Sequence, residues 1–412
     1  MISIRYAFAC ACFTACALLP AQLKAQQPAQ QQGPQPAPPA AFHIQSDNRV
    51  TFQLRASQAV KVELRGDWPG GLGGNTTVPM SKDDATGIWT VTVGPLTSDA
   101  WNYNFIVDGV TMPPAAPSLA DLVSGALPAG KLVIPGAYGS DFGPQNVPHG
   151  TVSYPYAPFR GLSKILEVYL PAGYLEKPTQ RYPVLYISGY SNEWEHSVNL
   201  HFLLDNMIAS GRIKPMIAVV LDPNATDPIS LGQTPYPGGG GMGAPGFLKS
   251  AQAIADEIVP WVDKAYRTIP DRDHRAITGF SSPGSLGFMA GANNPDKFAY
   301  IGVFSGGFPT WPDVSVRIES KLDPKQFSGP DLDRVPDMKV LGSEIPKLLP
   351  SANFKLVYLS NGTNEPLVQT EALVKKLLDD RGVKYHQADL PGYIHEWRSV
   401  RYALRDFLPM IF

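Results

Sequence analysis

Hydrophobic and polar residues alternate with a period of two in four stretches near the start of the chain, at 50–54, 60–64, 88–93 and 103–107. Successive side chains of a strand point to opposite faces, so this period predicts half-buried β-strands. Gly, Pro, Asn and Asp separate the stretches, and Asp108-Gly109 is typical of a tight hairpin turn. No helical period occurs among them. Residues 41–135 are therefore predicted to form a small antiparallel sandwich.

From residue 161 to residue 412 the pattern changes to continuous apolar runs that alternate with helical periods. Residues 182–188 and 215–221 are apolar almost throughout, as expected of strands covered on both faces. Residues 201–210 and 251–266 have apolar side chains three or four positions apart, which predicts helices. Further strands are expected at 165–170, 300–304, 354–359 and 385–388, further helices at 371–380 and 399–407, and a strand, a sharp turn and a helix over 275–292. This alternation predicts a doubly wound, mostly parallel sheet.

The first 40 residues follow neither pattern. Arg5 precedes an apolar run at 6–19, and Ala25 ends a short polar stretch, which is the arrangement of a secretory signal over residues 1–25. The run is too short to span a membrane. Gln, Pro and Ala dominate residues 26–40, which predicts a semi-extended linker. We therefore expect a secreted or periplasmic protein, with residues 136–160 connecting its two folded domains.

All three cysteines lie inside the predicted signal. The mature chain would then have no disulfide, no thiolate metal site and no cysteine nucleophile. Lipid attachment at Cys16 is an alternative, but residues 13–15 match that signal poorly. With a formal net charge of -2, the chain lacks the excess of basic residues that is typical of nucleic-acid-binding proteins.

A serine stands just after one of the predicted strands. The apolar run that ends at Gly279 is followed by Phe280, Ser281, Ser282 and Pro283. A strand that turns sharply into a helix here would expose the hydroxyl of Ser281, and would aim the next backbone N–H at the group it attacks. The usual signature is Gly-x-Ser-x-Gly, from which Pro283 departs. A serine between small residues is also typical of an ordinary turn, so the interpretation depends on its context.

Glu365 and His395 supply that context, because each lies in a loop after a predicted strand. The order serine, acid, histidine is that of the α/β-hydrolases. The carboxyl ends of parallel strands meet at one edge of a sheet, so we expect the three side chains to converge there. A neutral imidazole would take the serine proton, and a carboxylate would orient the ring. Asp222, after another strand, is the second choice for the acid.

We also expect groups that bind the oxyanion and the substrate at the same edge of the sheet. Backbone N–H groups of Ser282 and Tyr190 are predicted to bind the oxyanion. Gly189, Trp194 and Trp397 are predicted to contact the substrate, and packing under loops is the alternative for the two tryptophans.

We expect neither a cofactor nor a metal. His196 and His201 have no clustered carboxylates or thiolates around them and are interpreted as helix-surface residues. The glycine run at 238–243 lacks the lysine of a phosphate-binding loop and is interpreted as a loop at the cleft mouth. His386 is a strand residue and a weaker general base than His395. The predicted enzyme is therefore metal-independent.

Several motifs together carry a family resemblance: Tyr182-Pro183-Val184-Leu185-Tyr186, Glu257-Ile258-Val259-Pro260-Trp261-Val262-Asp263, His274-Arg275-Ala276-Ile277-Thr278-Gly279, Phe304-Ser305-Gly306 and Gly392-Tyr393-Ile394-His395-Glu396-Trp397. With them the chain resembles the esterase-D family of α/β-hydrolases, which includes feruloyl and acetyl-xylan esterases, enterochelin esterases and mycolyltransferases. Arg65-Gly66-Asp67-Trp68 and Gly87-Ile88-Trp89 resemble the immunoglobulin-like early-set domain, which is related to glycogen-binding modules.

The resemblance implies a secreted serine esterase that acts on acetyl or feruloyl esters of carbohydrate, or on a phenolic or siderophore ester. Three residues depart from the family pattern, namely Ser188 for a histidine, Pro283 for a glycine and Glu365 for an aspartate. An inactive hydrolase domain on a carbohydrate-binding protein, and transfer of the acyl group to a sugar, remain as alternatives. A carbohydrate platform formed by Trp68, Trp89 and Trp101 is one interpretation. The favoured one places Trp89, and with it Trp101, in the sandwich core and expects Trp68 to be the exposed one of the three.

Overall fold

The computed structural model describes residues 41–68, 76–112, 130–189, 194–221, 244–306, 347–365 and 367–412. The predicted signal and linker, and the three cysteines with them, lie outside the described residues. Tyr190, Asp222 and the glycine run at 238–243 also lie outside them.

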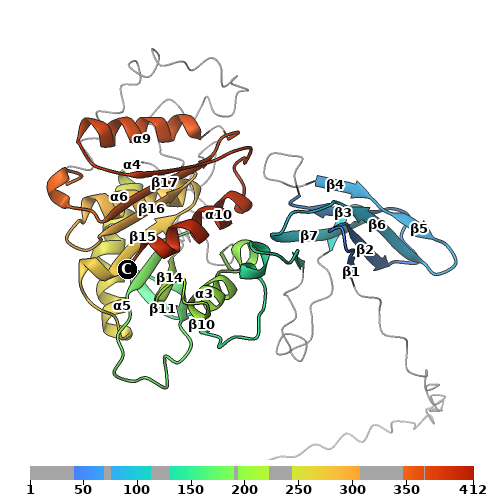
Figure 1. The fold of residues 1–412 in the computed structure, drawn as a ribbon, viewed down its shortest axis with the longest axis horizontal. Coiled ribbons are helices and arrows are strands. Elements are labelled where there is room, and N and C mark those ends of the chain that lie inside the picture. Colours follow the sequence, from blue (N-terminus) through green and yellow to red (C-terminus); the bar gives the residue numbers. More distant parts are fainter. Residues whose placement is uncertain are drawn as a thin grey trace, which may run out of the picture. The chain divides into compact units, whose positions relative to one another are not determined.

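The N-terminal strands form a β-sandwich in which every pairing is antiparallel (Figure 1). One sheet has the order β1-β2-β6-β5, and the other has the order β4-β3-β7-β8 with β9 also paired to β7. Their bounds are β1 (Phe42–Ile44), β2 (Val50–Arg55), β3 (Val62–Gly66), β4 (Thr76–Pro79), β5 (Ser81–Asp83), β6 (Ile88–Val93), β7 (Ala100–Val107), β8 (Val110–Met112) and β9 (Lys131–Val133). The predicted small all-β domain is confirmed.

The tryptophans of this sandwich are all in its core. Trp68 is 5% exposed, Trp89 7% and Trp101 1%. The expectation of an exposed Trp68 is therefore wrong. Its ring folds back over Gly66, where a Cβ would lie 1.9 Å from the ring, and it packs on Phe52 with 5.9 Å between ring centroids. A glycine two residues earlier thus makes room for the indole inside the domain.

The second domain is built on a nine-stranded sheet of order β10-β12-β14-β13-β15-β16-β17-β18, with β11 paired to β12. The pairings from β14 through β18 are parallel, whereas β10, β11 and β12 pair antiparallel. The bounds are β10 (Thr151–Ser153), β11 (Tyr156–Phe159), β12 (Leu162–Leu170), β13 (Val184–Ser188), β14 (Ile217–Leu221), β15 (Arg275–Gly279), β16 (Tyr300–Phe304), β17 (Leu356–Gly362) and β18 (His386–Leu390). The predicted mostly parallel sheet is confirmed, and the segment predicted to connect the domains contributes two of its strands.

Helices cover both faces of this sheet, as alternation along β13 illustrates. Val184 and Tyr186 belong to the core cluster that includes residues of α4 (Ala244–Ala253), α5 (Val259–Ala265), α6 (Ser281–Asn293) and α9 (Val368–Asp380). Leu185 and Ile187 belong to the cluster that includes residues of α3 (Leu200–Ala209) and α10 (Trp397–Phe407). A strand buried on both faces has no polar side to expose, which explains its continuous apolar run.

The helix predicted over 251–266 is interrupted. A π-helical stretch, Ile254–Ile258, separates α4 from α5, and Pro260 stands at the start of α5. Proline has no N–H to donate to the preceding turn, so a regular α-helical ladder cannot pass through it. The other short helical segments are Gly139–Phe142, Trp194–Val198, Arg272–His274, Pro350–Ala352 and Leu408–Met410.

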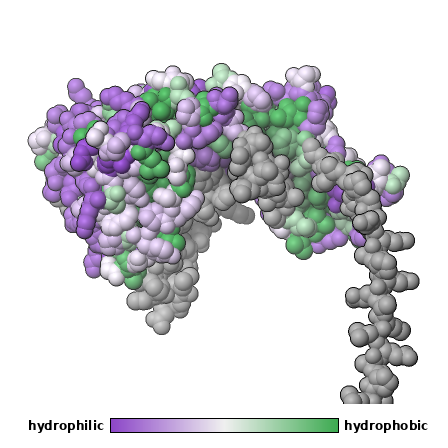
Figure 2. Space-filling model, turned by 90° about the horizontal axis from the view of Figure 1, so that it is seen from below, coloured by the Kyte–Doolittle hydropathy of each residue, from purple (hydrophilic) through white to green (hydrophobic). Residues whose placement is uncertain are grey.

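Among the described residues, no helix combines the length and the apolar character that crossing a bilayer requires. On the face shown in Figure 2, hydrophobic residues form separate patches within a largely hydrophilic surface.

Candidate active site

Ser281 occupies the corner between β15 and α6. Its φ of 59° is left-handed, whereas Phe280 before it is extended. For a residue with a side chain this conformation costs on the order of 1–3 kcal/mol, so the surrounding structure has to impose it. The helix begins at once, because the N–H of Gly284 donates to the carbonyl of Phe280 at 3.1 Å. Pro283 fits in the first turn, where backbone N–H groups have no helical partner to lose.

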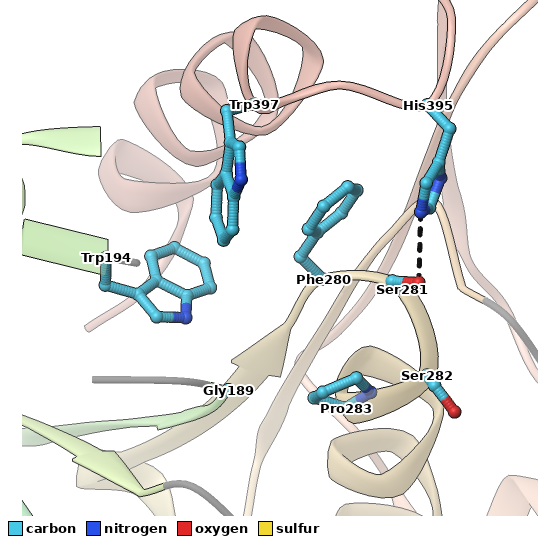
Figure 3. Close-up of a pocket in the computed structure, with 8 residues that line it drawn as sticks. All are labelled: Gly189, Trp194, Phe280, Ser281, Ser282, Pro283, His395 and Trp397. Carbon is cyan, nitrogen blue, oxygen red and sulfur yellow. Dashed lines mark hydrogen bonds between the residues drawn. The ribbon is translucent and has the colours of Figure 1, made fainter. Parts of the chain in front are cut away.

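The histidine and the acid of the predicted site lie within hydrogen-bonding distance of each other and of this serine. His395 Nε2 is 3.0 Å from Ser281 Oγ (Figure 3), and His395 Nδ1 is 2.9 Å from Glu365 Oε2. The ionised carboxylate can only accept, so it assigns the ring proton to Nδ1 and leaves Nε2 free to accept from the serine hydroxyl. The side chain of Glu365 is completely buried, whereas that of His395 is 30% exposed. The structure therefore brings Ser281, Glu365 and His395 together.

Hydrogen bonds between two loops keep the acid beside the histidine. The N–H of Asn364 donates to the carbonyl of Tyr393 at 3.0 Å, and the N–H of Gly392 donates to Thr363 Oγ1 at 2.9 Å. Glu365 Oε1 also accepts from the N–H of Gly362 at 2.9 Å. One carboxylate oxygen is thus used to fix the side chain and the other faces the imidazole. Asp222, the second choice for the acid, lies outside the described residues.

An aromatic wall stands next to the imidazole. The Phe280 ring stacks on that of His395, with 4.6 Å between centroids and 26° between planes. Trp397 lies 4.8 Å from Phe280, and Trp194 meets Trp397 edge-on at 5.7 Å. Sequence reasoning missed Phe280 because it occupies a variable position of the serine motif, and only its bulk among small neighbours could have signalled it.

These residues line a pocket of about 220 Å³ that opens over Ser281. Its lining consists of Gly189, Trp194, Phe280, Ser281, Ser282, Pro283, His395 and Trp397 (Figure 3). Gly189 is needed for space, since a Cβ there would lie 2.3 Å from Nε1 of Trp194. Trp194 is fully buried and supports the wall, whereas Trp397 is only partly buried. The predicted contact residues within the described chain thus all border this pocket, and Tyr190 lies outside the described residues.

Glu371 is a second buried carboxyl group near the acid, and sequence reasoning missed it. It lies in the first turn of α9 and is 2% exposed. Burial raises the pKa of Glu371 to about 7. The charge of Lys375 and a hydrogen bond from Gln387 lower this pKa, whereas the negative charges of Asp389 and Glu365 raise it further. Because Glu371 is in a polar helix turn, no sequence pattern distinguished it from a solvated residue.

The other histidines that were considered lie elsewhere. His386, on β18, is exposed and stacks on Tyr358 with 5.2 Å between centroids. His201 lies on α3 with its ring 4.0 Å from that of Phe202. Within the described ranges, no group of three or more His, Cys, Asp or Glu side chains could hold a metal ion.

Comparison with known families identifies the fold that carries this site. Residues 164–406 match the family model described as "Putative esterase". The chain belongs to this esterase family. Residues 40–114 match carbohydrate-binding module 48, the isoamylase N-terminal domain.

Relatives of this esterase-family chain include an endo-1,4-β-xylanase/feruloyl esterase of Xylanibacter ruminicola, which is 29% identical over 278 residues. That match covers 64% of this chain and 36% of the relative, so the chain spans about a third of the relative's length. An enterobactin esterase of Shigella flexneri has a similar structure, with a TM-score of 0.54, 17% identity, and coverage of 88% of this chain and 92% of that one. A ferulic acid esterase of Anaeromyces mucronatus gives a TM-score of 0.50 at 19% identity, covering 68% of this chain and 96% of that one. At these identities the structural similarity shows the fold alone.

Proposed function

We propose that this chain is a serine carboxylic-ester hydrolase that works through an acyl-enzyme. The observation that supports this most directly is the hydrogen-bonded series from Ser281 Oγ through the imidazole of His395 to the carboxylate of Glu365. A serine hydroxyl is a weak nucleophile until a neutral imidazole accepts its proton. The buried carboxylate holds the imidazole in the required tautomer and stabilises the imidazolium that forms.

In the first half-reaction, Ser281 Oγ attacks the ester carbonyl carbon while His395 Nε2 takes the hydroxyl proton. The oxyanion accepts hydrogen bonds from the backbone N–H of Ser282, at the start of α6, and from that of Tyr190, a role that rests on the sequence alone. Each such donor contributes about 10²–10³ in rate. The tetrahedral intermediate then breaks the bond to the alcohol oxygen, which takes the proton from His395. Water repeats the sequence on the acyl-enzyme, releases the acid and restores Ser281.

For the substrate we propose acetyl or feruloyl esters of carbohydrate, or a related phenolic or siderophore ester. The partly exposed rings of Phe280 and Trp397, with the buried Trp194 packed behind Trp397, favour an acyl group with a flat ring. Aromatic rings gain about 0.5–1.5 kcal/mol per well-placed pair beyond the area they bury. The name of the Xylanibacter ruminicola relative supports the same class.

Two proposals concern the N-terminal region. The match to carbohydrate-binding module 48 supports a glycan contact by the sandwich, for which residues other than its three buried tryptophans would have to be used. Residues 1–25 are proposed to direct export to the periplasm or medium. N-terminal sequencing of the exported protein tests this, and a new N-terminus at residue 26 is expected.

Hydrolysis of p-nitrophenyl acetate and methyl ferulate by the wild type and by Ser281→Ala tests the enzymatic proposal. We expect the substitution to lower kcat by about 10³-fold or more. Ser285→Ala is a matched control, because Ser285 lies on the same helix and its buried hydroxyl has no hydrogen-bond partner among the described residues. Equal rates in the wild type and in Ser281→Ala would reject the proposal and favour an inactive, glycan-binding hydrolase domain. Adding a sugar as acceptor and measuring the acylated sugar by chromatography distinguishes acyl transfer from hydrolysis.

A further inference from the structure

Asp99, just before β7 of the sandwich, forms ion pairs with two arginines of α10 in the esterase domain. Its Oδ1 accepts from Nε of Arg401 at 2.8 Å, and its Oδ2 lies 3.4 Å from Nε of Arg398. The side chains of Asp99 and Arg401 are 2% and 0% exposed. Arg401 also donates to the carbonyl of Ser197 at 2.6 Å and to that of Ala100. Removing one partner of such a buried pair leaves an uncompensated charge, so loss of either side chain should be strongly destabilising.

The two arginines are at the end of α10 where positive charge is least favourable. The helix begins at Trp397, two residues after His395, and both Arg398 and Arg401 are within its first turns. A helix N-terminus carries a partial positive charge, which disfavours cations and favours carboxylates. The first turn of α10 contains no acidic residue, and Glu396 makes no side-chain capping hydrogen bond. Glu396 at the N-cap, with Oε1 4.0 Å from Nη1 of Arg398, supplies one negative charge there, and Asp99 adds a second from the sandwich.

Arg398 extends the contact to the loop that carries His395. Its guanidinium lies 4.9 Å from the ring of Trp101, in the sandwich core, and 5.0 Å from the ring of Tyr393. The carbonyl of Tyr393 accepts from Asn364, next to Glu365. A continuous series of contacts thus joins Asp99 to the loops that hold the imidazole and the carboxylate of the site.

We propose that Asp99 is a positioning residue for the esterase reaction, so that the sandwich is a required part of the esterase site in addition to any glycan contact. By holding Arg398 and Arg401, it keeps the start of α10 folded and His395 at hydrogen-bonding distance from Ser281. The inference rests on the proposed function. Residues 164–406 match the esterase family, so a residue outside that region would complete the site.

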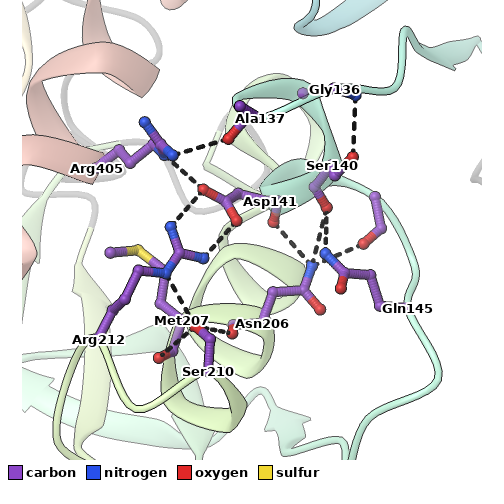
Figure 4. Close-up of polar contacts among 12 residues, drawn as sticks. Gly136, Ala137, Ser140, Asp141, Gln145, Asn206, Met207, Ser210, Arg212 and Arg405 are labelled. Carbon is purple, nitrogen blue, oxygen red and sulfur yellow. Dashed lines mark hydrogen bonds and ion pairs between the residues drawn. The ribbon is translucent and has the colours of Figure 1, made fainter.

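Asp141 provides a matched comparison at the other end of the same helix. It too binds two arginines, Arg212 and Arg405, and lies between them in Figure 4. Arg405, however, is in the last turn of α10, far along the helix from His395. The side chain of Arg405 is 31% exposed. Asp141 thus tests what losing an acid–arginine contact does to α10 without disturbing its first turn.

The experiment measures kcat and KM for p-nitrophenyl acetate, together with the unfolding temperature, in full-length Asp99→Asn, Asp141→Asn and wild type. We expect both variants to unfold at lower temperature. Only Asp99→Asn should lower kcat per folded molecule, by about 10- to 100-fold, with little change in KM, because a small displacement of a catalytic group has effects of this size. Wild-type kcat in folded Asp99→Asn would overturn the proposal, as would an equal loss of kcat in Asp141→Asn.

Arg398→Lys serves if Asp99→Asn does not fold. This variant keeps the charge but loses the planar guanidinium that lies near the rings of both Trp101 and Tyr393, and it should lower kcat several-fold. An unchanged kcat in Arg398→Lys would then overturn the inference. Turnover by wild type that Ser281→Ala does not reduce would overturn the proposed function and this inference together. Ser281-dependent turnover with no effect at Asp99 would overturn this inference alone.

Discussion

A Cβ atom on Gly279 would lie 2.9 Å from Cα of Gly284, and a Cβ on Gly284 would lie 2.6 Å from the carbonyl oxygen of Gly279. The end of β15 and the first turn of α6 therefore approach each other through two glycines that flank Ser281. The usual Gly-x-Ser-x-Gly pattern would place the second glycine at position 283, where this chain has a proline. In this chain the close approach falls one residue later, and Pro283 is free to line the pocket.

We predict that Gly284→Ala damages the site more than Pro283→Gly does. The added methyl group of alanine must displace backbone at the corner that holds Ser281, so kcat should fall by about 10- to 100-fold. Pro283→Gly leaves this contact intact and should keep kcat within a few-fold, while lowering the free energy of unfolding by about 0.4–1 kcal/mol through greater freedom of the unfolded chain. Steady-state kinetics and thermal unfolding measure both effects. Wild-type kcat in Gly284→Ala would show that the second glycine is dispensable.

Glu365→Gln should lower kcat by about 10⁴-fold with little change in unfolding temperature. Glutamine can still accept from the N–H of Gly362, which preserves the local structure, but it places an amide where the imidazole needs an anion. Glu371→Gln is the matched control, since it makes the same change at a buried carboxyl group on the following helix. If Glu365→Gln turned over at a near-native rate, the acid would have to be sought elsewhere, beginning with Asp222.

The elements of the sheet were predictable where a single physical cause sets the pattern. β13 and β14 are buried on both faces, so their residues had to be apolar. β10 and β11 were missed because they contain only three and four residues within a segment rich in Gly, Pro and Tyr. Trp68 was misjudged because its burial depends on Gly66, two positions away, and on how the chain bends between them.

The site was partly predictable because parallel strands bring the loops after them to one edge of the sheet. Ser281, Glu365 and His395 each follow a strand, so their convergence could be expected without any coordinates. Contacts between the two domains, in contrast, have no recognisable pattern in the sequence. Asp99 and Arg401 are separated by 302 positions, and each looks like an ordinary surface charge when the chain is examined locally. Burial and pairing of such groups are properties of the folded chain, which composition and periodicity do not reveal.

Glu371 should make the protein less stable as the pH rises. Its pKa of about 7 in the folded protein is above the ordinary 4.5, so the folded state holds the proton more tightly than the unfolded state does. The favourable contribution is complete below about pH 4.5 and is lost as the pH rises through 7. Glu371→Gln cannot titrate at this position and so lacks this loss of stability with rising pH. The unfolding temperature of Glu371→Gln minus that of the wild type should therefore increase from pH 5 to pH 8. Thermal unfolding at both pH values measures the difference, and a constant difference would show that Glu371 is ionised in the folded protein.

Trp397 should decide how well the enzyme accepts aromatic acyl groups. Its ring lies 4.8 Å from Phe280 and borders the pocket, while remaining partly exposed. Trp397→Leu removes this flat surface, so kcat/KM for methyl ferulate should fall about tenfold more than kcat/KM for p-nitrophenyl acetate. The acetyl ester serves as an internal reference, because any displacement of His395 slows both reactions equally and cancels in the ratio.

Trp261→Leu is the external control for this last change, because Trp261 lies on α5 and packs against Tyr266, 6.1 Å away, rather than against the pocket. It should alter stability and leave the ratio of the two kcat/KM values as in wild type. An unchanged ratio in Trp397→Leu would mean that the acyl group does not contact this wall. The aromatic residues around Ser281 would then serve to hold His395 in place through Phe280, and the acyl group would have to bind on another side of the nucleophile.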